Sequence, residues 1–224
     1  MNEEWKQAEA ALSRMEVLKN GENDPVTVLG EADELYCAGI GTDAAVFVYR
    51  PLPKYAFKLY AHEALPKKQA EIRVYQALGS NAYFPEYYGS GPRYVVISHE
   101  EGDTLYDCLL YGIPVPEQVI EDVEAARHYV REKGLNPRDI HLKNVLLQNG
   151  RGKVLDVSEY IQDGNDNRWE HLVWAYDNVY PLLKGKRMPL WLLEAVKNGY
   201  NRLDPAESNL EDFANWIKRL FLKR

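Results

Sequence analysis

A polar loop between two apolar segments constrains this chain more than any other feature of its sequence. A segment with a helical pattern precedes residues 134–147, and a short apolar run ends them. Between the two lies a polar loop in which Asp139 and Asn144 are spaced as Asp-x-x-x-x-Asn. A second apolar run ends at Asp156, which predicts a β-hairpin with a carboxylate at its end. Mg²⁺ takes a few hard oxygen ligands and fills its other positions with phosphate oxygens and water. The pattern therefore indicates a site for a magnesium–nucleotide complex.

Length, charge and cysteine content narrow the class of protein. The 224 residues can bury a core as one domain or as two small lobes that share a cleft. A net charge of -7 argues against broad nucleic-acid binding. The apolar runs are far shorter than the ~20 residues of a membrane helix, and the N-terminus has no apolar signal region. We therefore expect no membrane partner. Cys37 and Cys108 are the two cysteines and have no metal-like spacing, so we also expect no zinc site and a cytoplasmic location.

A glycine turn lies upstream, within residues 35–49, which we expect to form two strands. Its pattern is Gly39-x-Gly41-x-x-Ala44-x-Val46. Glycine lets the backbone approach a ligand closely and present its N–H groups to phosphate. Taken alone, the pattern is equally typical of a plain β-hairpin turn.

Together these motifs resemble the protein-kinase superfamily. Residues 136–144, Asn-Pro-Arg-Asp-Ile-His-Leu-Lys-Asn, resemble its catalytic loop, and residues 154–158, Val-Leu-Asp-Val-Ser, resemble its metal-binding Asp-Phe-Gly triplet. The resemblance covers about residues 35–183 and is nearest to small bacterial proteins described as serine/threonine protein kinases. It implies an α+β bilobal fold, with a small antiparallel-sheet N-lobe that has one helix and a reduced, mostly helical C-lobe.

The resemblance also implies a domain organisation and further elements. We expect an accessory N-terminal helix within residues 1–24, with Trp5, Ala8, Leu12 and Met15 on one face, an N-lobe at 25–101 and a C-lobe at 102–224. An apolar stripe at residues 119–130 predicts the helix that precedes the catalytic loop, and residues 169–183 predict one more helix. A last helix would begin at Asp204-Pro205 and bury Phe213, Trp216, Ile217 and Leu220; Trp191 is also expected in the core.

The resemblance assigns roles to the polar residues. Asp139 would accept or orient the proton of the attacking hydroxyl. Asn144 would bind the second magnesium, and Asp156 would bridge metal and phosphates. Lys58, on a strand at residues 55–60, would pair with the α- and β-phosphates. Glu71, on a helix that begins near Pro66, would hold the lysine in place, and Glu63 is the other candidate for this role. If neither residue is functional, Lys58 would be a lysine that protects an edge strand and Glu71 a solvated surface glutamate.

The adenine site would be made largely of backbone. Val46 would cover the ring, Ile97 would guard the back of the pocket, and backbone groups of Ser98, His99 and Glu100 would face the adenine edge. Backbone recognition leaves no side-chain signature, so these positions rest on the resemblance alone.

Several positions depart from the commonest kinase pattern. Ala44 replaces the third glycine, Pro137 replaces a histidine, and Ser158 replaces the glycine after Asp156. His141 stands where eukaryotic protein kinases carry lysine, as in aminoglycoside and choline kinases; it could touch the transferring phosphate or brace the loop.

The segment after Asp156 is short and has no Ala-Pro-Glu motif. Asp166 would brace the backbone of the catalytic loop. Alternatively, Asp166 or Asn167 could serve only as an N-cap, with Glu170 completing a capping box on Asn167; both can hold.

The expected function is ATP- and Mg²⁺-dependent transfer of a phosphoryl group to serine or threonine hydroxyls of proteins, with ATP bound between the lobes. One alternative is a small-molecule kinase, which His141 and the short segment after Asp156 favour. Another is a nucleotide-binding module without turnover, which is suggested by the departures at Ala44, Pro137 and Ser158. An ATP-hydrolysis assay separates the module from an enzyme.

Overall fold

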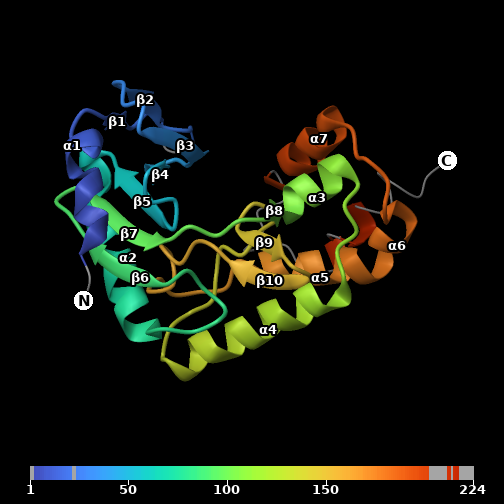
Figure 1. Cartoon of the computed structure of the whole chain (residues 1–224). Coiled ribbons are helices and arrows are strands. Elements are labelled where there is room, and N and C mark those ends of the chain that lie inside the picture. The colour runs from blue at the N-terminus through green and yellow to red at the C-terminus, as the bar shows by residue number, and fades with distance from the viewer. Residues whose placement is uncertain (1–2, 22–23, 202–210, 213, 217–224) are drawn as a thin grey trace. The chain divides into compact units, whose positions relative to one another are not determined.

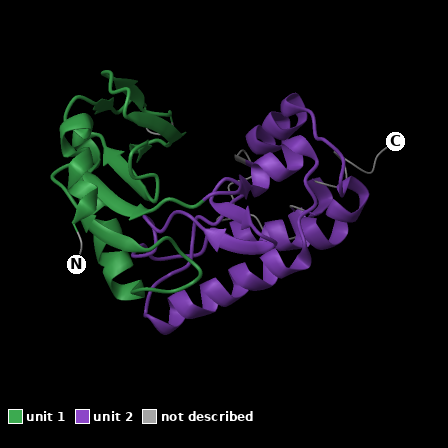
Figure 2. Cartoon of the chain, in the orientation of Figure 1, with its two compact units in different colours: residues 1–100 green, residues 101–224 purple. Residues whose placement is uncertain are grey.

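The computed structural model describes residues 3–21, 24–201, 211–212 and 214–216 (Figure 1). The chain divides into two compact units, residues 1–100 and 101–224 (Figure 2). The fold is α+β with antiparallel sheets, as the sequence predicts, and it is consistent with a small bilobal kinase-like protein.

Unit 1 is built on a five-stranded antiparallel sheet with the order β3-β4-β5-β7-β6. Its strands are β3 (Leu35–Ile40), β4 (Ala44–Tyr49), β5 (Tyr55–Tyr60), β6 (Tyr87–Ser90) and β7 (Tyr94–Ser98). The strands expected over residues 35–49 and 55–60 are confirmed. Since β5 lies between β4 and β7, the reading of Lys58 as an edge-strand lysine is wrong.

Helices pack on both faces of this sheet. On the Lys58 face lies α2 (Leu65–Leu78), which ends at Gly79, whose positive φ of +61° is one that glycine adopts without strain. On the other face lie η1 (Glu4–Ala8) and α1 (Glu9–Leu12), where the buried Trp5 ring packs edge-on against Tyr94 at 6.3 Å.

The N-terminal helix is shorter than expected. It ends at Leu12, and β1 (Glu16–Leu18) then pairs antiparallel with β2 (Thr27–Leu29). The alternation in β1, with buried Val17 between two more exposed neighbours, is the period of a strand. The helical spacing of Met15 with Leu12 therefore misled the sequence prediction.

Unit 2 holds the loop that the sequence singled out. Helix α4 (Glu117–Glu132) buries its predicted stripe, and Gly134 follows with φ +72°. A three-stranded sheet has the order β10-β9-β8, with β8 (Asp103–Thr104), β9 (Val145–Gln148) and β10 (Arg151–Val154). Asn149 and Gly150, with φ 51° and 79°, close the β9–β10 hairpin, as suits a two-residue turn.

Unit 2 also contains α3 (Leu105–Tyr111), α5 (Arg168–Asn178), α6 (Tyr180–Leu183) and α7 (Leu190–Asn201). The single helix predicted over residues 169–183 is broken at Val179. Pro181, at the start of α6, explains the break because it lacks an N–H donor and its ring would clash inside a continuous helix.

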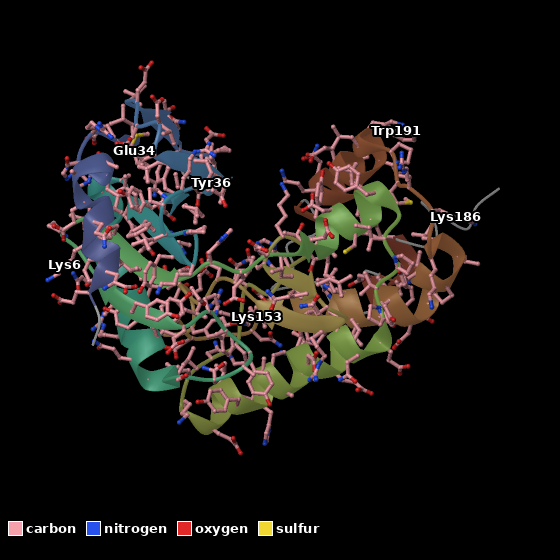
Figure 3. The ribbon with its side chains drawn as sticks, viewed as in Figure 1. Lys6, Glu34, Tyr36, Lys153, Lys186 and Trp191 are labelled. Carbon is pink, nitrogen blue, oxygen red and sulfur yellow. The ribbon has the colours of Figure 1, made fainter. Side chains whose placement is uncertain are left out.

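Some C-terminal expectations fail or lie beyond the described part of the chain. Trp191, on α7, is 71% exposed and is not a core residue (Figure 3). Trp216 is partly buried against Val179. The expected helix start at Asp204-Pro205 and the apolar residues Phe213, Ile217 and Leu220 fall outside the described residues. Among the described helices, none has the length and apolar content to cross a bilayer.

Candidate active site

One face of the unit 1 sheet gathers four of the predicted nucleotide-binding residues. Gly39 lies opposite Val46, and Val46 lies opposite Lys58 across three adjacent strands. Ile97 lies opposite Ala56, two residues before Lys58. Because directly opposed residues, and residues two apart on a strand, share a face, Gly39, Val46, Lys58 and Ile97 lie on the same side of the sheet.

A buried ion pair joins this face to α2. Lys58 Nζ lies 2.9 Å from Glu71 Oε2 and 3.1 Å from Oε1. The Glu71 side chain is 0% exposed and that of Lys58 is 14% exposed. The hydroxyl of Tyr60 donates to the same Glu71 carboxylate, and its ring centroid lies 5.7 Å from Lys58 Nζ. The lysine is therefore held by the glutamate that the sequence reading preferred, while Glu63 is exposed in η2 (His62–Ala64).

The glycine turn is a tight hairpin whose backbone groups are partly engaged. Gly41 N–H donates to the Ala44 carbonyl, and the Gly41 carbonyl accepts from Val26 N–H, both at 2.9 Å. Asp43, at the tip, bonds Lys19 at 2.6 Å and Lys67 at 2.5 Å. Sequence reading missed this anchor because its partners are 24 residues away on either side.

The predicted hinge uses two of its N–H groups within unit 1. Ser98 N–H donates to the Glu86 carbonyl at 2.8 Å, and His99 N–H donates to the Lys54 carbonyl at 2.9 Å. The Ser98 hydroxyl donates to Glu100 Oε1 at 2.5 Å. An adenine edge would have to be recognised by other backbone groups of this segment.

In unit 2, the loop around Asp139 is fixed by hydrogen bonds to its own backbone. Asp139 has a left-handed φ of 55°, which aspartate tolerates better than most residues. Its N–H donates to Asp166 Oδ2 at 2.7 Å, and its carbonyl accepts from Asn144 Nδ2 at 3.0 Å. The bracing role predicted for Asp166 is confirmed. The capping box is wrong, because Asn167 makes no capping bond and Glu170 pairs with Arg127 at 2.5 Å.

A residue that the sequence analysis did not select reaches the Asp139 carboxylate. The guanidinium of Arg168, at the start of α5, forms an ion pair with Asp139 Oδ1, and its Nε lies 3.6 Å from Asp166 Oδ2. His141 Nε2 lies 4.0 Å from Asp139 Oδ1. Asp139 therefore lies between a permanent cation and an imidazole.

Comparison with known proteins identifies a kinase-like relative of this chain. The chain is 32% identical over 221 residues to "Putative serine/threonine-protein kinase YrzF" of Bacillus subtilis (strain 168), which covers 97% of this chain and 96% of the relative. The chain belongs to this kinase-like family. No protein-family model matches it.

In this kinase-like protein, burial moves the pKa values of the two loop residues in opposite directions. Burial raises the pKa of Asp139 to about 6; Arg168 opposes the rise, and the Asp156 and Asp166 charges add to it. Burial also lowers the pKa of His141 to about 4, and Arg168 adds to that effect. At neutral pH the carboxylate is ionised yet more basic than usual, as suits a group that accepts a proton, and the imidazole is neutral.

The donors near the β9–β10 hairpin fit a magnesium ion carried by phosphates. Since Asn144 Nδ2 holds the loop, its amide oxygen is the atom that it could offer to a cation. Asp156 Oδ1 accepts from Ser158 N–H at 2.9 Å, which orients the carboxylate. Within the described residues, no three His, Cys, Asp or Glu side chains cluster as a metal cage. One carboxylate and one amide suit Mg²⁺, which keeps water and phosphate ligands.

Proposed function

We propose that this protein is an ATP- and Mg²⁺-dependent phosphotransferase that transfers the γ-phosphoryl group to serine or threonine hydroxyls of a protein. The observation that carries the proposal is the ion pair between Lys58 and the buried Glu71. Such a pair loses solvation and is often no more stable than apolar residues of similar volume. A buried pair between a central strand and α2 is therefore better explained by a ligand, and the α- and β-phosphates of ATP match the lysine.

The other proposed roles are divided between the two units. We propose that the residues 25–101 form the N-lobe and supply Lys58 and the glycine turn, and that residues 102–224 form the C-lobe and supply Asp139, Asn144 and Asp156, all acting on one nucleotide. Asp139 orients the acceptor hydroxyl and takes its proton. Asn144 and Asp156 hold Mg²⁺, which neutralises phosphate charge when bound.

A turnover assay tests this proposal. The wild type is expected to release labelled phosphate from [γ-³²P]ATP in the presence of Mg²⁺ or to transfer it to protein, while Asp139→Ala and Asp156→Ala lose at least about 100-fold in rate. Asp163→Ala, which removes an exposed carboxylate from the same unit, is the control and should match the wild type. Wild-type protein that binds ATP but never turns it over would leave only a nucleotide-binding module.

A small-molecule kinase is the second candidate, and one observation favours it. Only residues 157–167 separate Asp156 from the start of α5, which is little chain for a peptide-docking segment. The same labelled ATP, offered with a protein mixture and with a panel of hydroxyl compounds that includes aminoglycosides and choline, separates the two. We expect label on protein; label on a metabolite alone would establish the alternative.

A further inference from the structure

Arg168 occupies a position that helix stability does not explain. It is the first residue of α5, and the N-terminus of a helix carries partial positive charge that disfavours a cation. Its guanidinium nevertheless pairs with Asp139 and lies 3.6 Å from Asp166. The two carboxylates of the catalytic loop region, rather than the helix, therefore account for an arginine at this position.

The contacts of Arg168 leave it able to bind a further oxygen. A guanidinium has five N–H donors; here Nη1 contacts Asp139 and the buried Nε faces Asp166, which leaves Nη2 without a hydrogen bond to the described residues. Its side chain is 36% exposed. The basic residues of the loop itself are engaged elsewhere. Arg138 Nε lies 3.5 Å from Glu159, and Lys143 Nζ lies 4.6 Å from the ring centroid of Tyr106.

We propose that Arg168 binds the γ-phosphoryl oxygens of the nucleotide during transfer, an inference that rests on the function proposed above. In that reaction the acceptor oxygen forms a bond to the γ-phosphorus, and its proton passes to Asp139. The bond from phosphorus to the bridging oxygen breaks, and its electron pair leaves with ADP. A hydroxyl held by Asp139 must lie next to the γ-phosphorus, so a guanidinium on Asp139 lies beside the phosphoryl oxygens as well.

The chemistry of arginine suits this role. Its planar fork can contact a carboxylate and a phosphoryl oxygen at the same time, and it stays charged at any working pH. Negative charge spreads over the equatorial oxygens of the transferring group, and a fixed cation there lowers the barrier. Arg168 is thus a substrate-contacting residue that comes from α5, 29 residues beyond Asp139.

The test compares Arg168→Gln with Arg131→Gln, which removes the same charge from an exposed position in the last turn of α4. Steady-state hydrolysis of Mg·ATP, without acceptor, and phosphorylation of an array of serine and threonine peptides with acidic, neutral and basic flanks are both measured. For Arg168→Gln we expect kcat to fall by about 100-fold or more in both assays, with the KM for ATP nearly unchanged. Arg131→Gln should keep the wild-type rate.

Other outcomes overturn the inference. A wild-type kcat in Arg168→Gln does so. Intact hydrolysis combined with a selectivity across the peptide array that differs from the wild type also does so, because it would assign the arginine to the acceptor. If Arg168→Gln fails to fold, Arg168→Lys replaces it, with at least a tenfold loss of kcat expected; a wild-type rate would refute the role. An inactive wild type counts against the proposed function itself, which keeps the two failures apart.

Discussion

At the scale of single residues, Tyr60 matters because it shares the buried Glu71 carboxylate with Lys58. In Tyr60→Phe the carboxylate loses one donor while the ring remains. We expect the free energy of unfolding to fall by about 1–3 kcal/mol, the cost of leaving a buried charged acceptor without that bond. We also expect the KM for ATP to rise severalfold, because Lys58 is less firmly placed.

Urea unfolding and ATP titration measure the two effects of Tyr60→Phe. Tyr94→Phe is the matched control, since its hydroxyl bonds Glu9 at 3.2 Å on the other face of the same sheet. It should change stability without changing the KM. An equal rise of the KM in both variants would show that Tyr60 only supports the fold.

A substitution at Gly39 should weaken ATP binding without lowering the stability of the fold. A Cβ at Gly39 would meet no heavy atom within 4 Å, and its φ is not in the left-handed range. Valine favours strands, so Gly39→Val should keep or slightly raise the free energy of unfolding. If the glycine serves a bound nucleotide, ATP affinity should fall by about tenfold in calorimetric titration, because a side chain blocks close approach. If Gly39→Val binds ATP with the affinity of the wild type, the glycine motif is an ordinary turn.

At the scale of elements, the tip of the β3–β4 hairpin is anchored through Asp43. Burial raises the pKa of Asp43, but the hydrogen bonds from Lys19 and Lys67 outweigh burial, so its pKa lies below the ordinary 3.8. A lowered pKa stabilises the fold above the unfolded-state value, and that contribution is lost as the pH falls through the folded-state value. Asp43→Asn should cost at most about 1 kcal/mol at pH 7, because the pairs are partly exposed.

The pH dependence checks this anchor. The difference in unfolding free energy between wild type and Asp43→Asn should persist from pH 7 down to about pH 4 and shrink below it. A difference that grows on acidification would contradict the assignment. Added salt should also reduce it.

The β9–β10 hairpin that leads to Asp156 is tied to α4 through Asp122. Its carboxylate accepts from Arg151 Nε at 2.8 Å and Nη2 at 2.7 Å, and from Gly152 N–H at 2.8 Å. Asp122→Ala should lower the free energy of unfolding by about 2 kcal/mol, because it strips partners from a partly buried network. Chemical denaturation measures the loss. Glu121→Ala, at the exposed neighbour, should cost little.

At the scale of the whole molecule, local pattern was enough for the strands on either side of the glycine turn, for α4 and for the loop at Asp139. Each of these has its own periodicity and turn residues. What the sequence could not supply were contacts between distant residues. Arg168 meets Asp139 across 29 positions, and Asp43 meets Lys19 across 24. The break at Val179 did have a local signal in Pro181. The apolar spacing of the flanking residues nevertheless led us to predict one continuous helix.

The proposed function requires both Lys58 and Asp156 to act on the bound nucleotide, and calorimetric titration with ATP, with and without Mg²⁺, tests this most directly. Wild type should bind more tightly with Mg²⁺. Lys58→Met should weaken binding under both conditions, and Asp156→Asn should abolish the gain from Mg²⁺ while leaving metal-free binding intact. If Asp156→Asn keeps the full gain from Mg²⁺, or Lys58→Met binds as the wild type does, Lys58 and Asp156 do not both act on the nucleotide and the proposed function is contradicted.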